Sequence, residues 1–191
     1  MADTLVLLRL EHRNFLRVLD VLDRVGRRIE RGEDYDAALL DLIFEYLLGY
    51  PDCCHHPKED LVLRQLRRVA PEEAERVGDL INDHQELGQL VRRAAEHARR
   101  AGGRGDATLA VEVRHVVDVY REHLQTEERV FFPTVERVLR PVDWEVVDFT
   151  MFDQPDPLFD EPAEQYYQRL RGAIFDRQAG EPPPGAAEAE A

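Results

Sequence analysis

Apolar residues recur in alternating steps of three and four along much of the chain, which is the period of a helix that packs against other helices. We call such a row of residues on one helix face a seam. The first seam predicts a helix that fades at Arg31-Gly32-Glu33. It consists of Leu5, Leu8, His12, Phe15, Leu19 and Leu22. His12 is its one polar member, so the sequence predicts a histidine inside the protein.

A second helix is predicted from about Tyr35 to Val69, with an interruption near Gly49-Tyr50-Pro51. Beyond the interruption its inward seam contains His55, Glu59, Val62, Leu66 and Val69. Pro57 lies within this helix and removes a backbone donor, so we expect a kink there.

Two further helices follow the same pattern. Pro71, with two glutamates directly after it, marks a helix start. The third seam contains Val77, Leu80, His84, Leu87, Val91, Ala94 and Ala98. The turn Gly102-Gly103-Arg104-Gly105 ends this helix, and the fourth helix closes before Pro141. The fourth seam contains Leu109, Val113, Val116, Tyr120, His123, Glu127 and Val130.

The four seams and their short links predict an all-α fold, an up-down antiparallel four-helix bundle in residues 1–140. Residues 141–179 read as a C-terminal helical extension that caps one end of the bundle. It has an apolar stretch at Trp144–Phe152, a turn at Gln154-Pro155-Asp156-Pro157 and a helix from about Pro162 to Arg177. Residues 180–191 are rich in proline, glycine, alanine and glutamate, so we expect a disordered tail.

Composition narrows the function classes. The chain has 191 residues, which suits one domain, and its net charge of −14 disfavours binding to nucleic acid or to anionic lipid. No stretch approaches the roughly 20 apolar residues of a membrane span, and the run Leu5–Leu8 is too short for a signal sequence, so we expect a cytoplasmic protein. Cys53 and Cys54 are adjacent, which allows only a strained bridge, so we interpret both as thiols.

Four of the seven histidines, at positions 12, 55, 84 and 123, lie in seams, whereas His56, His97 and His115 fall outside them. Glu59 and Glu127 each follow a seam histidine by four residues and therefore share its helix face. A single seam histidine is more often a hydrogen-bonded core residue than a ligand. This explanation does not extend to two buried carboxylates among four imidazoles, because unpaired buried carboxylates are costly and cations stabilise them. The pattern predicts a dinuclear metal site inside the bundle.

The natural partition gives one metal His12 and His55 and the other His84 and His123, with Glu59 and Glu127 bridging both. Imidazole and carboxylate ligands suit iron, manganese or zinc, and the seams contain no thiolate. The remaining coordination positions would take an oxo or hydroxo bridge, water, dioxygen, peroxide or a side chain. Tyr120, one turn before His123, is the best such side chain, although an aromatic core residue is the commoner role.

Some assignments stay open. His56 is three residues before Glu59 and could replace or supplement His55, although the four-residue spacing repeated in the fourth helix favours His55. Glu128 is adjacent to Glu127, so the choice between these two glutamates as ligand is also open. Glu11 and Asp83, each directly before a seam histidine, could orient a ligand from behind or could be solvated.

His12, the run His55-His56-Pro57-Lys58-Glu59, His84 and the run His123-Leu124-Gln125-Thr126-Glu127-Glu128 resemble the hemerythrin-like, or HHE cation-binding, family over about residues 4–140. The resemblance implies a four-helix bundle with a non-haem di-iron centre held by His12, His55, Glu59, His84, His123 and Glu127. The segment Asp156-Pro157-Leu158-Phe159 also resembles the C-terminal extension of bacterial members. Respiratory hemerythrins supply two histidines one turn apart from their third helix, whereas Gly88 stands one turn after His84. We therefore expect that neither metal has three histidines and that the centre favours irreversible chemistry over reversible oxygen binding.

The resemblance implies several functions. The first hypothesis is a non-catalytic protein with two iron ions, ahead of manganese or zinc, that binds dioxygen, nitric oxide or iron as a sensor, store or scavenger. The second is a di-iron enzyme that consumes peroxide in a catalase-like reaction or acts as an oxidase. A third hypothesis is that the metals only stabilise the helical bundle. The expected partners are a small diatomic ligand or peroxide, with no nucleic acid and no membrane, and the sequence shows no dedicated general base or substrate pocket.

Overall fold

The computed structural model describes residues 3–152 and 163–179, and every regular element within them is a helix. The prediction of an all-helical fold is confirmed for these residues. The predicted turn at 154–157, the segment 156–159 and the tail 180–191 lie outside them. Within the described part of the chain, none of the helices combines the length and the apolar character that crossing a bilayer requires.

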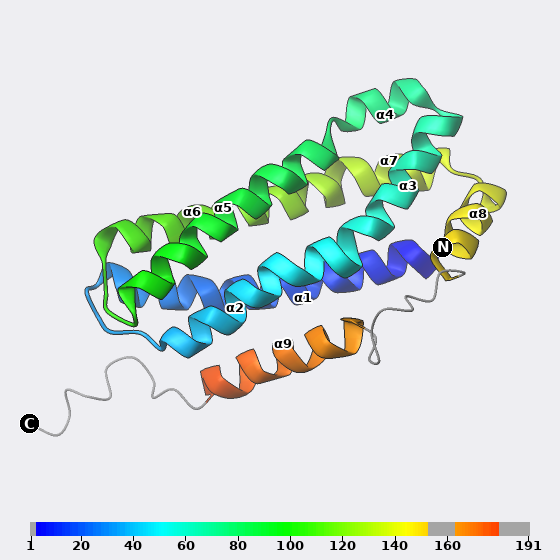
Figure 1. Ribbon diagram of the computed structural model, residues 1–191. Coiled ribbons are helices and arrows are strands. Elements are labelled where there is room, and N and C mark those ends of the chain that lie inside the picture. The colour runs from blue at the N-terminus through cyan, green and yellow to red at the C-terminus, as the bar shows by residue number, and fades with distance from the viewer. Residues whose placement is uncertain (1–2, 153–162, 180–191) are drawn as a thin grey trace, which may run out of the picture.

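The second predicted helix is continuous through its predicted interruption (Figure 1). It comprises α2 (Ala37–Tyr50), a π-helical turn η1 (Pro51–His55) and α3 (His56–Val69). Asp36 caps its start, because its carboxylate accepts from the backbone N–H groups of Ala38 and Leu39 at 3.0 and 3.2 Å. The interruption expected near residues 49–51 is therefore a widened turn within one helical run.

The fourth helix has the same construction, with α6 (Ala107–Thr126), a π-helical turn η2 (Glu127–Phe131) and α7 (Phe132–Val138). A proline, Pro57 or Pro133, stands two residues after the end of each π turn. Proline has no N–H to donate to the preceding turn, which favours a wider local path of the backbone. The kink expected at Pro57 takes the form of this π turn, and both π turns lie where the seams carry a glutamate and histidines.

The third predicted helix is divided in two, α4 (Pro71–Val77) and α5 (Leu80–Ala101). Gly78 separates them with a φ of 95°, a conformation that glycine adopts at little cost. Val77 and Leu80 on either side are both buried, so the apolar period runs through a break that only the backbone reveals. The expectation of one unbroken third helix is wrong at this point.

Helix α1 (Asp3–Glu30) packs along α6, and α2 packs along α5. Figure 1 shows α8 (Pro141–Phe152) at the end of the molecule where the N-terminus lies, and α9 (Ala163–Ala179) alongside α2. Helix α8 contacts α3, as expected of a cap at one end. The expectation that the whole extension caps that end is wrong for α9, because its buried residues Leu170 and Ile174 join the core along the side of α2.

A layer of polar side chains divides the core into two apolar clusters. The larger cluster includes Phe15, Tyr50, Leu87, Tyr120 and Leu124. The smaller cluster includes Leu8, Val62, Leu80, Phe131 and Phe132. On each long helix the histidines and glutamates of the seams stand between a member of one cluster and a member of the other. The fold thus holds these polar groups in one layer with apolar walls on both sides.

Candidate metal centre

The most deeply buried part of the polar layer consists of His12, His55, Glu59 and Glu127, which we call the buried group. One ligand atom from each lies within 4.8 Å of the others, and all four residues are at most 2% exposed. His12 comes from α1, His55 and Glu59 from the second helical run and Glu127 from the first residue of η2. Three separate parts of the chain therefore meet at this point.

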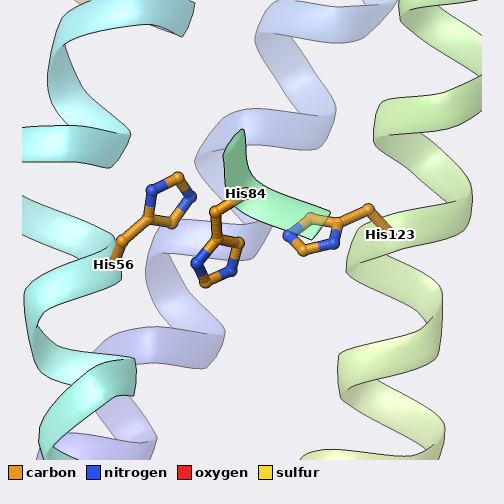
Figure 2. A group of neighbouring side chains, drawn as sticks. All are labelled: His56, His84 and His123. Carbon is orange, nitrogen blue, oxygen red and sulfur yellow. The ribbon is translucent and has the colours of Figure 1, made fainter. Parts of the chain in front are cut away.

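His56, His84 and His123 form the second part of the layer, which we call the histidine group. Their ring nitrogens also come within 4.8 Å of one another, and Figure 2 shows the three rings side by side, from α3, α5 and α6. The structure thus brings together all six residues that the sequence predicts as ligands, and it adds His56.

The two carboxylates face both groups. For Glu59, Oε1 lies 3.4 Å from Nε2 of His55, and Oε2 lies 3.4 Å from Nε2 of His84. For Glu127, Oε2 lies 3.4 Å from Nε2 of His12, and Oε1 lies 3.3 Å from Nε2 of His84. Each glutamate therefore presents one oxygen to each group, which is the arrangement of a carboxylate that bridges two cations.

His56 was expected outside the seams, and its placement corrects that expectation. Its ring stacks on the ring of His84 with centroids 3.7 Å apart and an angle of 6° between the planes. The π turn η1 ends at His55, and a π turn rotates less per residue than an α turn, so neighbouring histidines can face one site. The expectation of only two histidines for each metal stays a prediction, but the histidine group offers a third imidazole beside the two that were expected there.

Further carboxylates hold the outer nitrogens of these rings. Nδ1 of His55 lies 2.8 Å from Oε2 of the buried Glu11, which also accepts hydrogen bonds from Tyr50 and Lys58. Nδ1 of His12 lies 3.0 Å from Oε1 of Glu128. A proton held at Nδ1 by a carboxylate leaves the lone pair of Nε2 for a cation. Glu11 therefore orients a histidine from behind, as considered, but this histidine is His55 and not His12. Glu128 orients His12 in the same way and does not face both groups as a bridging carboxylate would.

The chemistry of the inward atoms fits a cation. Five buried atoms form no hydrogen bond although they point into the layer: Nε2 of His12 and of His55, both carboxylate oxygens of Glu59, and Oε2 of Glu127. Buried polar atoms normally have partners, because leaving them without any is costly. Imidazole nitrogens and carboxylate oxygens left in this way are donor atoms that a divalent or trivalent metal ion satisfies.

Comparison with protein families agrees with this geometry. The model of the hemerythrin HHE cation binding domain matches residues 3–135. The chain belongs to the hemerythrin HHE family. Comparisons with curated proteins and with solved structures gave no match. Membership of the HHE family and the two groups of ligand atoms together indicate a cation-binding site.

In the HHE domain without a cation, protons balance the buried charges. Burial alone would lower the pKa of His12 and of His84, but hydrogen bonds and charges from the carboxylates outweigh it and raise each pKa to about 9. Burial opposes ionisation of Glu59, yet the surrounding histidines hold its pKa well below the usual value. Burial and the charge of Glu59 raise the pKa of Glu127 to about 7. A bound cation would take the place of the protons on His12 and His84.

Tyr120 lies beside the HHE site but outside both groups. Its ring centroid is 6.4 Å from that of His123, and burial raises the pKa of its phenol well above the usual value. The phenol is therefore protonated at neutral pH, and the structure favours the role of an aromatic core residue.

Near the HHE site, one expectation from the sequence is wrong and one feature was not expected. Cys53 and Cys54 form a disulfide bond with each other, so the interpretation of both as thiols is wrong. Both cysteines lie in η1, and the prediction from helical spacing did not take the irregular backbone of this turn into account.

The structure also has a cavity of about 450 Å³ that reaches His123, with Leu87 and Val119 among its apolar lining and Glu122 among its polar lining. It gives small molecules a route to the histidine group.

Proposed function

We propose that this HHE protein holds two iron ions in a dinuclear site and binds a small ligand there, such as dioxygen, nitric oxide or peroxide. The two carboxylates, each with one oxygen toward the buried group and one toward the histidine group, carry this proposal. We further infer that the long helical runs form the up-down four-helix bundle of hemerythrins around this site.

The ligand sets follow from the two groups. His12 and His55 would hold one ion and His56, His84 and His123 the other. Glu59 and Glu127 would bridge the pair. Nitrogen and oxygen donors without thiolate suit iron, and also manganese or zinc, so metal identity is part of the proposal. Bound iron would supply Lewis acidity and redox chemistry to a small ligand.

The protein's own residues position and shield the site. Glu11 and Glu128 fix the rings of His55 and His12 through their Nδ1 atoms, so that both Nε2 atoms face inward. The apolar clusters on either side exclude water from the layer. Among the described residues, the cavity at His123 offers an approach to the histidine group.

This approach supports a second candidate function, the consumption of peroxide. A buried store of iron needs no open route for peroxide, whereas an enzyme does, and the cavity supplies one of suitable size. Binding and peroxide consumption share the same site and differ in turnover.

The test begins with metal content. Protein expressed with ample iron should contain about two ions per chain, mostly iron, by elemental analysis, and its visible spectrum should differ from that of the zinc-loaded protein. One ion or none would overturn the dinuclear site. Aerobic gas evolution after addition of peroxide, compared between iron-loaded and metal-free protein, then decides between binding and peroxide consumption.

A further inference from the structure

A continuous row of aromatic rings leads from the candidate metal centre to the surface at α9. The ring of His55 contacts Phe15 at 5.0 Å between centroids, and Phe15 contacts Tyr50 at 5.7 Å. Tyr50 contacts Tyr167 of α9 at 5.8 Å, and Tyr167 contacts Tyr166 at 5.0 Å. The row begins at a proposed metal ligand and ends at a side chain that is 41% exposed.

A carboxylate accepts the phenolic hydrogen bond of the first tyrosine and of the last tyrosine in this row. The hydroxyl of Tyr50 donates to Oε1 of Glu11 at 2.8 Å, and the other oxygen of Glu11 contacts Nδ1 of His55 at 2.8 Å. The hydroxyl of Tyr166 donates to the carboxylate of Glu45. A tyrosine gives up an electron readily only when its proton can leave at the same time, and both end tyrosines have an acceptor in place.

Gly49 permits the contact between α9 and the row. A Cβ atom at this position would lie 2.0 Å from the hydroxyl oxygen of Tyr167 and 2.6 Å from its Cζ, so a side chain there would force the ring of Tyr167 away from this place. The absence of a side chain at Gly49 therefore lets the ring of Tyr167 lie against Tyr50. Packing of α9 along α2 joins the row to the surface.

We propose, on the basis of the function proposed above, that Tyr50, Tyr167 and Tyr166 carry single electrons to the metal centre from a small one-electron donor, such as a phenol, at the surface of α9. The site would then reduce peroxide at the expense of an external donor. The three tyrosines are named below as the tyrosine row.

The transfer balances in electrons and protons. Bound iron would supply the redox chemistry with peroxide, and Tyr50 would then give one electron to the site while its phenolic proton moves along its hydrogen bond to Glu11. The Tyr50 radical takes an electron from Tyr166 through the ring of Tyr167 and regains its proton from Glu11, while Tyr166 passes its own proton to Glu45. The donor then gives one electron to Tyr166, Glu45 returns the proton, and the donor releases its proton to solvent. Two donor molecules thus supply two electrons, and with two protons one peroxide becomes two water molecules.

The main test is electron paramagnetic resonance of the iron-loaded full chain, frozen at intervals after addition of peroxide. The wild-type protein should show a tyrosyl radical that a phenol quenches. Tyr50→Phe should lower its yield about tenfold, and Tyr166→Phe should make the remaining radical survive the phenol about tenfold longer. Tyr35→Phe is the matched control, because Tyr35 is buried outside the row and donates to the carbonyl of Ala98. Equal yields and lifetimes in all four proteins would overturn the proposal.

Metal content and the visible spectrum separate this proposal from the proposed function. Both should be unchanged in Tyr166→Phe, since Tyr166 belongs to neither ligand group and bonds Glu45, away from the centre. A second measurement needs no iron: azide radicals made by pulse radiolysis should oxidise Tyr166 in the zinc-loaded protein, and the radical should then move to Tyr50. The phenoxyl absorption should follow different kinetics in Tyr50→Phe and in wild-type protein. Identical kinetics in Tyr50→Phe and wild-type protein would contradict electron transfer along the tyrosine row, whatever metal the protein carries.

Discussion

The buried group and the histidine group adjoin each other in one layer, but they differ in donor atoms and in surroundings. The buried group combines two imidazoles with two carboxylates, and its members are at most 2% exposed. The histidine group has imidazoles only, and a cavity reaches its member His123. One group is closed and contains both carboxylates, and the other contains imidazoles only and is accessible.

The carboxylates behind the two groups differ in the same way. Glu11, behind His55, has a side chain that is 2% exposed, whereas Asp52, which lies 3.3 Å from Nδ1 of His56, has a side chain that is 69% exposed. Charges buried together interact more strongly than charges in contact with water. If the site is dinuclear as proposed, the comparison predicts one firmly held cation position and one adjustable position beside it, joined by shared carboxylates.

The largest effect should come from a residue that serves both groups. Glu59→Ala removes an oxygen from each cation position, so iron bound per chain should fall close to zero by elemental analysis. In the metal-free protein it also removes the buried partner of His12 and His84, and breaking such a pair costs about 3–5 kcal/mol of unfolding free energy. Denaturant unfolding of the metal-free variant measures that loss.

Glu128→Ala is the control for this prediction. Its side chain is 37% exposed, lies 3.0 Å from the outer nitrogen of His12 and 3.5 Å from Nε of Arg9, and belongs to neither ligand group, so metal content under ample iron should change little. Equal losses of iron from the two variants would mean that the wrong glutamate has been assigned to the bridge.

The next effect should separate the two groups. His56→Ala removes one of three ligands of the histidine group and none of the buried group, so we expect iron content to fall from about two ions toward one. His115→Ala should have no such effect, because His115 is exposed and lies outside both groups. Loss of both ions from His56→Ala would show that the two positions do not bind independently.

Gly88 offers a rescue of that variant. A Cβ atom at Gly88 would meet nothing within 4 Å, and position 88 stands one turn after His84 on the same face of α5. Gly88→His in the His56→Ala background should restore the second ion and a visible spectrum close to that of the wild type. If the double variant unfolds at the wild-type temperature but does not regain the second ion, a side chain at position 88 cannot take the place of His56 as third ligand.

His56 also shows what the sequence can and cannot predict. Seam positions are sufficient to bring His12, His84 and Glu127 to one layer, because helical periodicity fixes which face a residue occupies. They are insufficient for His56, because its direction depends on a π turn, and for the break at Gly78, because apolar residues flank it on both sides. Periodicity reports the direction of side chains along an ideal helix, so it fails where the backbone departs from one.

The prediction of where α9 packs was wrong for a related reason. The sequence shows a helix but not its docking surface, and the clue, Gly49 beneath Tyr167, is recognisable only once the two helices are seen together.

A smaller effect should come from the carboxylate behind the buried group. Glu11→Gln keeps the shape of the side chain but removes the charge that holds the proton at Nδ1 of His55. Losing such an outer partner typically weakens metal binding about 10- to 100-fold. Competition with a chelator measures the affinity, and Asp83→Asn serves as control because Asp83 is exposed. An unchanged affinity in Glu11→Gln would mean that His55 is held by packing alone.

The smallest effect should come from the equivalent change behind the histidine group. Asp52→Asn also removes a charge next to Nδ1 of a histidine in a ligand group, so its chemistry matches that of Glu11→Gln. Asp52 differs in exposure, and water already screens its charge, so the contact with His56 contributes at most about 1 kcal/mol. We therefore expect the affinity of the second ion to fall less than about tenfold, in the same chelator competition. A loss as large as that of Glu11→Gln would show that burial does not distinguish the two groups, and the contrast between a firm and an adjustable cation position would then have to rest on the donor atoms alone.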